Sequence, residues 1–81
     1  MASRAYILIE ATIGRSRDVA RAVQGLKPAV SESYLITGPY DVSAIVEGRD
    51  SDDITGIVTT KIHSIPGIAR TVTCLAHTER H

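Results

Sequence analysis

The chain has 81 residues, and its nine basic and nine acidic side chains give a formal net charge of zero at pH 7. This balance argues against direct nucleic-acid binding, which usually requires a basic excess. No apolar run approaches the roughly 20 residues of a membrane-spanning helix, so we expect a cytoplasmic protein without membrane contact.

The first expected elements are a strand and a helix. Arg4 to Thr12 reads as a strand because apolar residues recur at every second position. Ser16 is a suitable N-cap for a helix that runs to about Gln24. The apolar residues of this helix follow the i, i+3, i+4, i+7 spacing of one helical face: Val19, Ala22, Val23 and Leu26.

A β-hairpin is expected in the middle of the chain. Val30 to Thr37 and Val42 to Glu47 read as two strands. Between them stands Gly38-Pro39-Tyr40-Asp41, and glycine and proline are typical turn residues. We therefore place these four residues at the tip of the hairpin.

The last part of the chain predicts a second helix and a fourth strand. Ser51 is a second candidate N-cap, and the helix ends before Pro66-Gly67. Its expected apolar stripe consists of Ile54, Ile57, Val58, Ile62 and Ile65. Ile68 to His77 then reads as a strand, and the polar residues 78–81 as a frayed tail.

The resulting order, β-α-β-β-α-β, predicts an α+β fold of the ferredoxin-like type. Right-handed crossovers would give a four-stranded antiparallel sheet with both helices on one face. We expect residues 1–81 to form a single domain, since the chain shows no linker or low-complexity segment.

The second face of this sheet is expected to be apolar as well. Alternation puts Ile7 and Ile9 on one face of the first strand and Leu8 on the other. Ile45 likewise lies opposite the other aliphatic residues of the third strand. Cys74 is the only cysteine, so the chain has no internal disulfide, and it lacks a zinc ligand set. Burying each exposed aliphatic side chain is worth roughly 1.5–3 kcal/mol. We therefore expect a two-fold homodimer that packs sheet against sheet.

The hairpin turn also carries a candidate ligand site. The carboxylate of Asp41 can bind an ammonium group, and the ring of Tyr40 can form the wall of a pocket. The structural alternative is that Asp41 caps the backbone of the turn and Tyr40 packs at its rim.

Three other residue types are candidates for chemistry. Thr71 and Thr73 project from one face of the fourth strand and suit a carboxylate or amide, although threonine is common in strands. His63 is expected to interact with the C-terminal dipole of the second helix. Cys74 is expected to be a buried, unreactive side chain. We predict no catalytic residue, no metal site and no cofactor.

Four segments carry a resemblance to a known family. They are Ala5-Tyr6-Ile7-Leu8-Ile9, Thr37-Gly38-Pro39-Tyr40-Asp41-Val42, Lys61-Ile62-His63-Ser64-Ile65-Pro66-Gly67-Ile68 and Arg70-Thr71-Val72-Thr73. With these residues the chain resembles the ligand-binding domain of the Lrp/AsnC transcription regulators, the RAM domain, over about residues 4 to 77.

The resemblance implies a sheet-to-sheet dimer that assembles further, with an amino-acid effector bound between dimers. It implies that Gly38, Tyr40 and Asp41 belong to the effector loop and that Thr71 and Thr73 can face the same cleft. Because the first strand starts near residue 4, we expect a stand-alone form without the helix-turn-helix of the family. A full-length Lrp/AsnC relative is then a possible partner.

Two other functions are left as alternatives. One is a dimeric ferredoxin-like enzyme of the small monooxygenase type, which would need a polar constellation between helices and sheet. The other is a pure assembly domain, which would form the oligomer and bind no small molecule.

Overall fold

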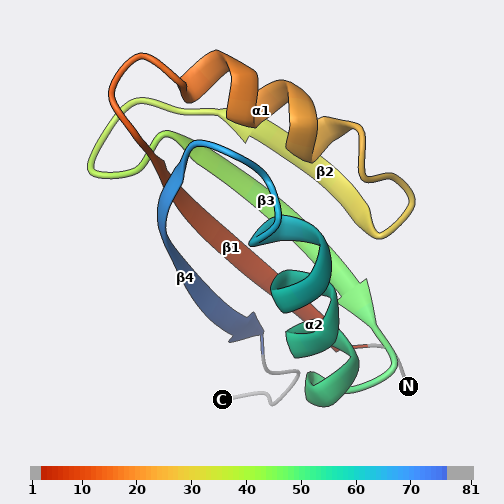
Figure 1. Ribbon diagram of the computed structural model, residues 1–81. Coiled ribbons are helices and arrows are strands. Elements are labelled where there is room, and N and C mark those ends of the chain that lie inside the picture. The colour runs from red at the N-terminus through yellow and green to blue at the C-terminus, as the bar shows by residue number, and fades with distance from the viewer. Residues whose placement is uncertain (1–2, 77–81) are drawn as a thin grey trace.

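The computed structural model describes residues 3–76 of the chain. The expected tail at 78–81 and the expected strand end at His77 lie outside the described residues. The elements follow the predicted order (Figure 1): β1 (Ser3–Ala11), α1 (Ser16–Gln24), β2 (Val30–Leu35), β3 (Val42–Gly48), α2 (Ser51–Ile57) with a π-helical turn η1 (Val58–Ile62), and β4 (Ile68–Ala76).

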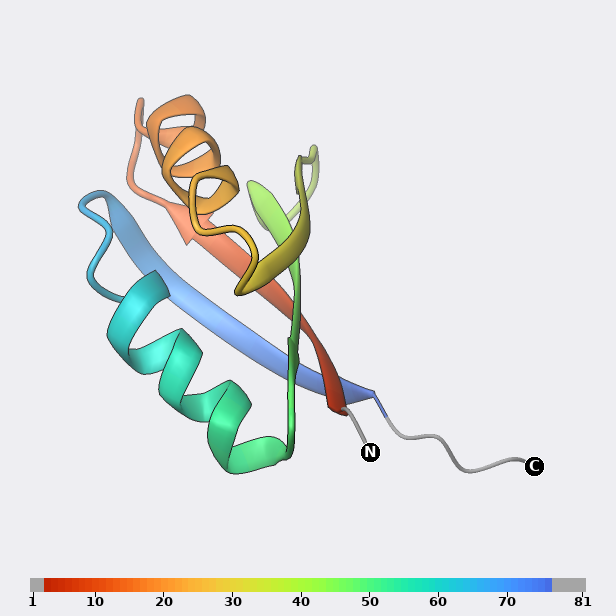
Figure 2. The ribbon, with the colours of Figure 1, turned by 90° about the vertical axis from the view of Figure 1, so that its right-hand side faces the viewer.

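The four strands form one sheet in the order β2-β3-β1-β4, and every neighbouring pair is antiparallel. Both helices lie on one side of this sheet, as Figure 2 shows. The α+β, ferredoxin-like architecture is thus confirmed. The sheet order makes β2 and β4 the edge strands, so each has one side without a neighbouring strand among residues 3–76.

The core lies between the helices and the sheet and is entirely aliphatic. Alternation along β1 and β3 places every second side chain in it, as predicted. No polar or charged side chain is buried among the described residues. The core consists of Ala5, Ile7, Ile9, Val19, Val23, Val30, Val42, Ala44, Val46, Ile54, Val58 and Ile62.

The α1 stripe differs from the prediction at one position. Val19 and Val23 are buried, but Ala22 is exposed, and Ala20 packs against the core instead. The two alanines have the same size, so the larger Val19 and Val23 determine how the helix is oriented about its own axis. Periodicity therefore identified the helix but misplaced one edge of its apolar face.

Both helix caps differ from the serines predicted. Arg15 occupies the cap position of α1 and makes no side-chain cap hydrogen bond, and Ser16 is the first helical residue. At α2 the cap is Asp50, whose Oδ1 accepts a hydrogen bond of 2.9 Å from the backbone N–H of Asp53. An extended Asp50 reaches the third helical N–H, which is the usual geometry of a capping carboxylate.

The second helix does not keep one helical geometry to its end. After Ile57 the chain passes into η1, where the backbone N–H of His63 donates to the carbonyl of Val58, five residues earlier, at 2.9 Å. Such π turns occur often at functional sites. Here the turn ends at His63 and points this side chain toward β4.

The face of the sheet opposite the helices is called the open face below. It carries aliphatic and aromatic side chains together with one cysteine. The register of the strands puts the following side chains on this face: Tyr6, Leu8, Tyr34, Ile45, Val72 and Cys74. Cys74 is exposed, so the prediction of a buried cysteine was wrong. It lies opposite Tyr6 on the edge strand β4, where no helix covers it. Among the described residues, no helix is long and apolar enough to cross a membrane.

Candidate functional site

Asp41 joins the β2–β3 hairpin to the end of β1. Its Oδ2 accepts a hydrogen bond of 2.8 Å from the backbone N–H of Ala11, and its own N–H donates to the carbonyl of Ile9 at 2.9 Å. The register of β1 against β4 shifts between Glu10 and Ala11, so the carboxylate satisfies an N–H at a β-bulge. The carboxylate of Asp41 therefore caps a backbone N–H, but this N–H belongs to β1 and not, as was expected, to the turn.

The turn is longer than predicted because β2 ends at Leu35 and not at Thr37. Residues 36–41 form the loop, which the backbone N–H of Ile36 closes by donating to the carbonyl of Asp41 at 2.8 Å. Gly38 has φ +151°, a conformation that side chains other than glycine rarely adopt, and a Cβ there would meet no atom within 4 Å. Gly38 is therefore required for the path of the backbone and lies in the open.

Tyr40 is held by an arginine from β4. The Nη2 of Arg70 donates a hydrogen bond of 2.8 Å to the Tyr40 hydroxyl, and the guanidinium lies 5.5 Å from the ring centroid. On its other side, Arg70 Nε is 3.7 Å from Oε1 of Glu10, its cross-strand partner. Tyr40, Asp41, Arg70 and Glu10 thus gather at one end of the sheet, and we call these four residues the sheet-end cluster.

Thr71 and Thr73 lie on one face of β4, as predicted, but this is the face turned toward the helices. Their cross-strand partners are the core residues Ile9 and Ile7. Thr71 Oγ1 is 2.8 Å from Nε2 of His63, at the end of η1. His63 therefore has a specific partner in addition to its position at a helix end.

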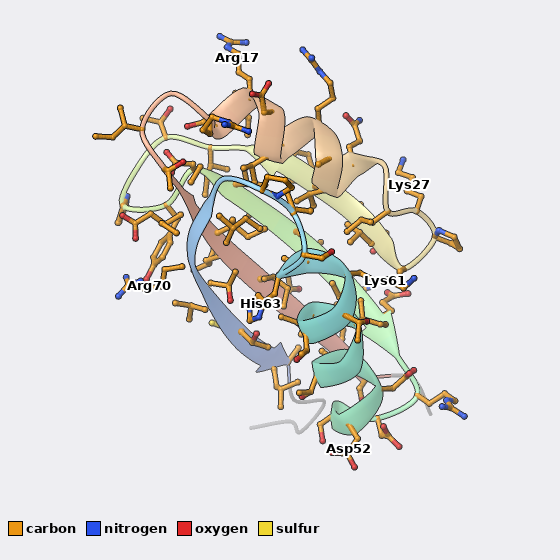
Figure 3. The ribbon with its side chains drawn as sticks, viewed as in Figure 1. Arg17, Lys27, Asp52, Lys61, His63 and Arg70 are labelled. Carbon is orange, nitrogen blue, oxygen red and sulfur yellow. The ribbon has the colours of Figure 1, made fainter. Side chains whose placement is uncertain are left out.

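Within one chain the structure does not bring the two groups of predicted site residues into one cleft. Figure 3 shows Arg70 on the outer side of β4 and His63 on the side of α2. Thr73 is exposed beside the edge of the sheet. A shallow depression nevertheless runs along this edge, and its lining combines residues of both sides: His63, Ile68, Ala69, Arg70 and Thr71.

Sequence reasoning gave no role to Arg70, Glu10 or the His63–Thr71 contact. Arg70 and Tyr40 are 30 positions apart in the sequence, so their contact depends on the strand order, which brings β4 and the β2–β3 loop to the same end of the sheet. Metal binding lacks a basis in residues 3–76, where no cluster of three His, Cys, Asp or Glu side chains could hold an ion.

The class of protein to which this fold belongs follows from a match to a family model. A model of the Lrp/AsnC ligand binding domain matches residues 4–79, nearly the whole chain. The chain therefore belongs to the family of Lrp/AsnC ligand-binding domains, which are regulatory parts of transcription regulators. A comparison with curated proteins gave no match.

Among solved structures, the chain is similar to TTHA0845 from Thermus thermophilus, with 35% identity, 98% coverage of both chains and a TM-score of 0.86. It is also similar to the hypothetical protein PHS023 from Pyrococcus horikoshii, with 33% identity, coverage of 100% and 95%, and a TM-score of 0.82. The transcriptional regulator NMB0573 from Neisseria meningitidis, solved as a complex with L-Met, shares the fold at 18% identity and a TM-score of 0.80. In that comparison 98% of this chain aligns with 53% of the regulator.

Proposed function

We propose that this chain is an amino-acid-sensing and oligomerisation module of the Lrp/AsnC type that acts without catalysis and without a DNA-binding domain of its own. One observation carries the proposal. A carboxylate, a phenol and a guanidinium, from Asp41, Tyr40 and Arg70, gather at one end of the sheet in a domain of a ligand-binding family. This combination suits a ligand that carries both an ammonium and a carboxylate group.

One oxygen of the Asp41 carboxylate has a structural role, and the other is not engaged by a described residue. The hydrogen bond to Ala11 engages Oδ2, and no described residue donates to Oδ1. A ligand ammonium could therefore bind Oδ1 without breaking the contact to β1. The neighbour NMB0573, whose structure contains L-Met, supports an amino acid as the class of effector.

The proposal includes a second copy of the chain over the open face. Leu8, Ile45 and Val72 are only half-buried in one chain, while Tyr6 and Tyr34 are 44% and 55% exposed. A contiguous apolar surface of this kind marks an interaction site. Charged pairs flank it at both ends, with Arg4–Glu47 at 2.7 Å and Arg70–Glu10 at 3.7 Å. A two-fold axis would bring such a surface against itself, and the sheet-end cluster would lie at the rim of that interface.

We propose a stand-alone form that acts in the cytoplasm. The two similar solved chains, of which 98% and 95% correspond to this domain, support the stand-alone form. Regulation would then require sensing alone or mixed assembly with a full-length Lrp/AsnC relative. A monooxygenase-type enzyme, the alternative function, would need a polar constellation between helices and sheet, where the core is aliphatic and the His63–Thr71 pair lies at the end of η1.

Thermal-shift measurements with each of the twenty L-amino acids at millimolar concentration test the sensing function. We expect one or a few to raise the melting temperature of the protein, because a ligand that binds only the folded state stabilises it. If no amino acid raises it, sensing fails and a pure assembly domain is the better description.

Sedimentation velocity at micromolar concentration tests the dimer. Leu8→Glu places a charge on the open face, and Leu75→Glu is the matched control, since Leu75 pairs with Ala5 on the helix face and is already 42% exposed. We expect the wild type and Leu75→Glu to sediment as dimers or larger species and Leu8→Glu as a folded monomer. A monomeric wild type would refute the sheet-to-sheet dimer.

A further inference from the structure

We infer that Arg70 binds the carboxylate of the ligand, so that the site selects α-amino acids in their zwitterionic form over amines and over acids without an amino group. This inference rests on the proposed function and assigns the second charged contact of the same site. Asp41 would take the ammonium group, and Arg70 would take the group of opposite charge.

The guanidinium of Arg70 is positioned by Tyr40 but is far from saturated. An arginine has five N–H donors, and within residues 3–76 the guanidinium of Arg70 donates a single hydrogen bond, to the Tyr40 hydroxyl. The contact to Glu10 at 3.7 Å is too long for a hydrogen bond. The side chain is 63% exposed, so its remaining donors are accessible.

The shape of the group favours a carboxylate over other anions of similar size. A guanidinium presents two parallel N–H donors that match the two oxygens of a carboxylate. The ring of Tyr40, whose centroid is 5.5 Å from the guanidinium carbon, limits its rotation. A side chain that is held in place loses less conformational entropy when it binds.

Arg70 also connects the two groups of predicted site residues. It contacts Tyr40 on the outer side of β4 and lines the edge depression together with Thr71 and His63. Among residues 3–76, Arg70 is the one side chain that belongs both to the sheet-end cluster and to the lining of the edge depression. A ligand bound to Arg70 could therefore reach the hairpin turn on one side and the threonine hydroxyl on the other.

Glu10 competes with the ligand in this arrangement. Its carboxylate is the nearest anion to Arg70 among the described residues and stands where a ligand carboxylate would approach the Nε side of the guanidinium. Replacement of Glu10 by glutamine removes the competing charge. We therefore expect Glu10→Gln to bind the ligand at least as tightly as the wild type.

The test uses the amino acid that stabilises the wild type most, together with its amide and its desamino acid, in calorimetric titrations. We expect the wild type to bind the amino acid at least about tenfold more tightly than either analogue, since a lost charged contact costs one factor of ten or more. We expect Arg70→Gln to lose about tenfold in affinity for the amino acid but not for the amide, and Arg70→Lys to lie between.

Arg4→Gln is the matched control, because Arg4 pairs with Glu47 on the same face at the other end of the sheet. It should bind the amino acid like the wild type. If the wild type binds an amino acid and Arg70→Gln binds it equally well, the role of Arg70 is overturned while the sensing function stands. If the wild type binds none of the twenty amino acids, the sensing function itself fails, and this inference fails with it.

Discussion

Substitution of Asp41 by alanine should destabilise the protein even without a ligand. The carboxylate accepts a part-buried hydrogen bond of 2.8 Å from the N–H of Ala11, at the bulge where the register between β1 and β4 shifts. A hydrogen bond to a charged group contributes about 1.5–3 kcal/mol, and its loss leaves the N–H unsatisfied. A small domain is stable by only about 5–15 kcal/mol in total. Since 1 kcal/mol shifts the melting temperature of such a domain by about 4–8 °C, Asp41→Ala should melt roughly 6–24 °C below the wild type.

Circular dichroism at fixed protein concentration measures this effect, in thermal and in urea unfolding. Asp41→Asn keeps an acceptor oxygen, so a neutral hydrogen bond worth about 1 kcal/mol replaces the charged one, and the variant should lose only about 0.5–2 kcal/mol. If Asp41→Ala has the same melting temperature as the wild type, the hydrogen bond from Ala11 to the carboxylate does not stabilise the fold, and our reasoning about the bulge is wrong. The result also decides how ligand binding by Asp41 variants is interpreted, because a destabilised apo protein weakens binding indirectly.

Three further predictions concern other parts of the fold. Asp50→Ala should cost about 0.5–2 kcal/mol in urea unfolding, because the cap of α2 is lost. Ile54→Ala should cost about 2–5 kcal/mol in the same assay, because Ile54 is fully buried in the core. The hydrogen bond to Glu32 raises the pKa of Tyr34. The contribution of this hydrogen bond to the stability of the fold is therefore fully present below the pKa of Tyr34 in the unfolded state. It is lost as the pH rises through the higher pKa of Tyr34 in the folded state. Glu32→Gln should lower the pKa of Tyr34, as measured by tyrosinate absorbance, and an unchanged titration would contradict the contact.

The fold was predictable because the local signals agreed with one another. Alternation in β1 and β3, the apolar stripe of α2 and the Gly38-Pro39 turn each point to one element, and together they permit few topologies. The right-handed crossovers then put both helices on one face of an antiparallel sheet. Helix caps were the weak point, since Ser51 and Asp50 are both good capping residues and only the backbone path selects between them.

The site was predictable only in part. The turn chemistry of Gly38 and the paired polar residues Tyr40 and Asp41 predicted a loop, and the structure places Tyr40 and Asp41 in contact with β4 and β1. Sequence patterns did not indicate Arg70, because its contact with Tyr40 joins β4 to a loop 30 positions away, which no local pattern encodes. The threonines of β4 were correctly placed on one face, but the sequence alone did not reveal that this face is turned toward the helices.

A crystal structure of the protein grown with its strongest amino-acid ligand tests the central claim most directly. Our account predicts two copies that face each other through Leu8 and Ile45 of their open faces, with the ammonium of the ligand at Asp41 and its carboxylate at Arg70. A structure in which the open face meets bulk solvent, or in which the ligand lies away from the sheet-end cluster, would contradict it.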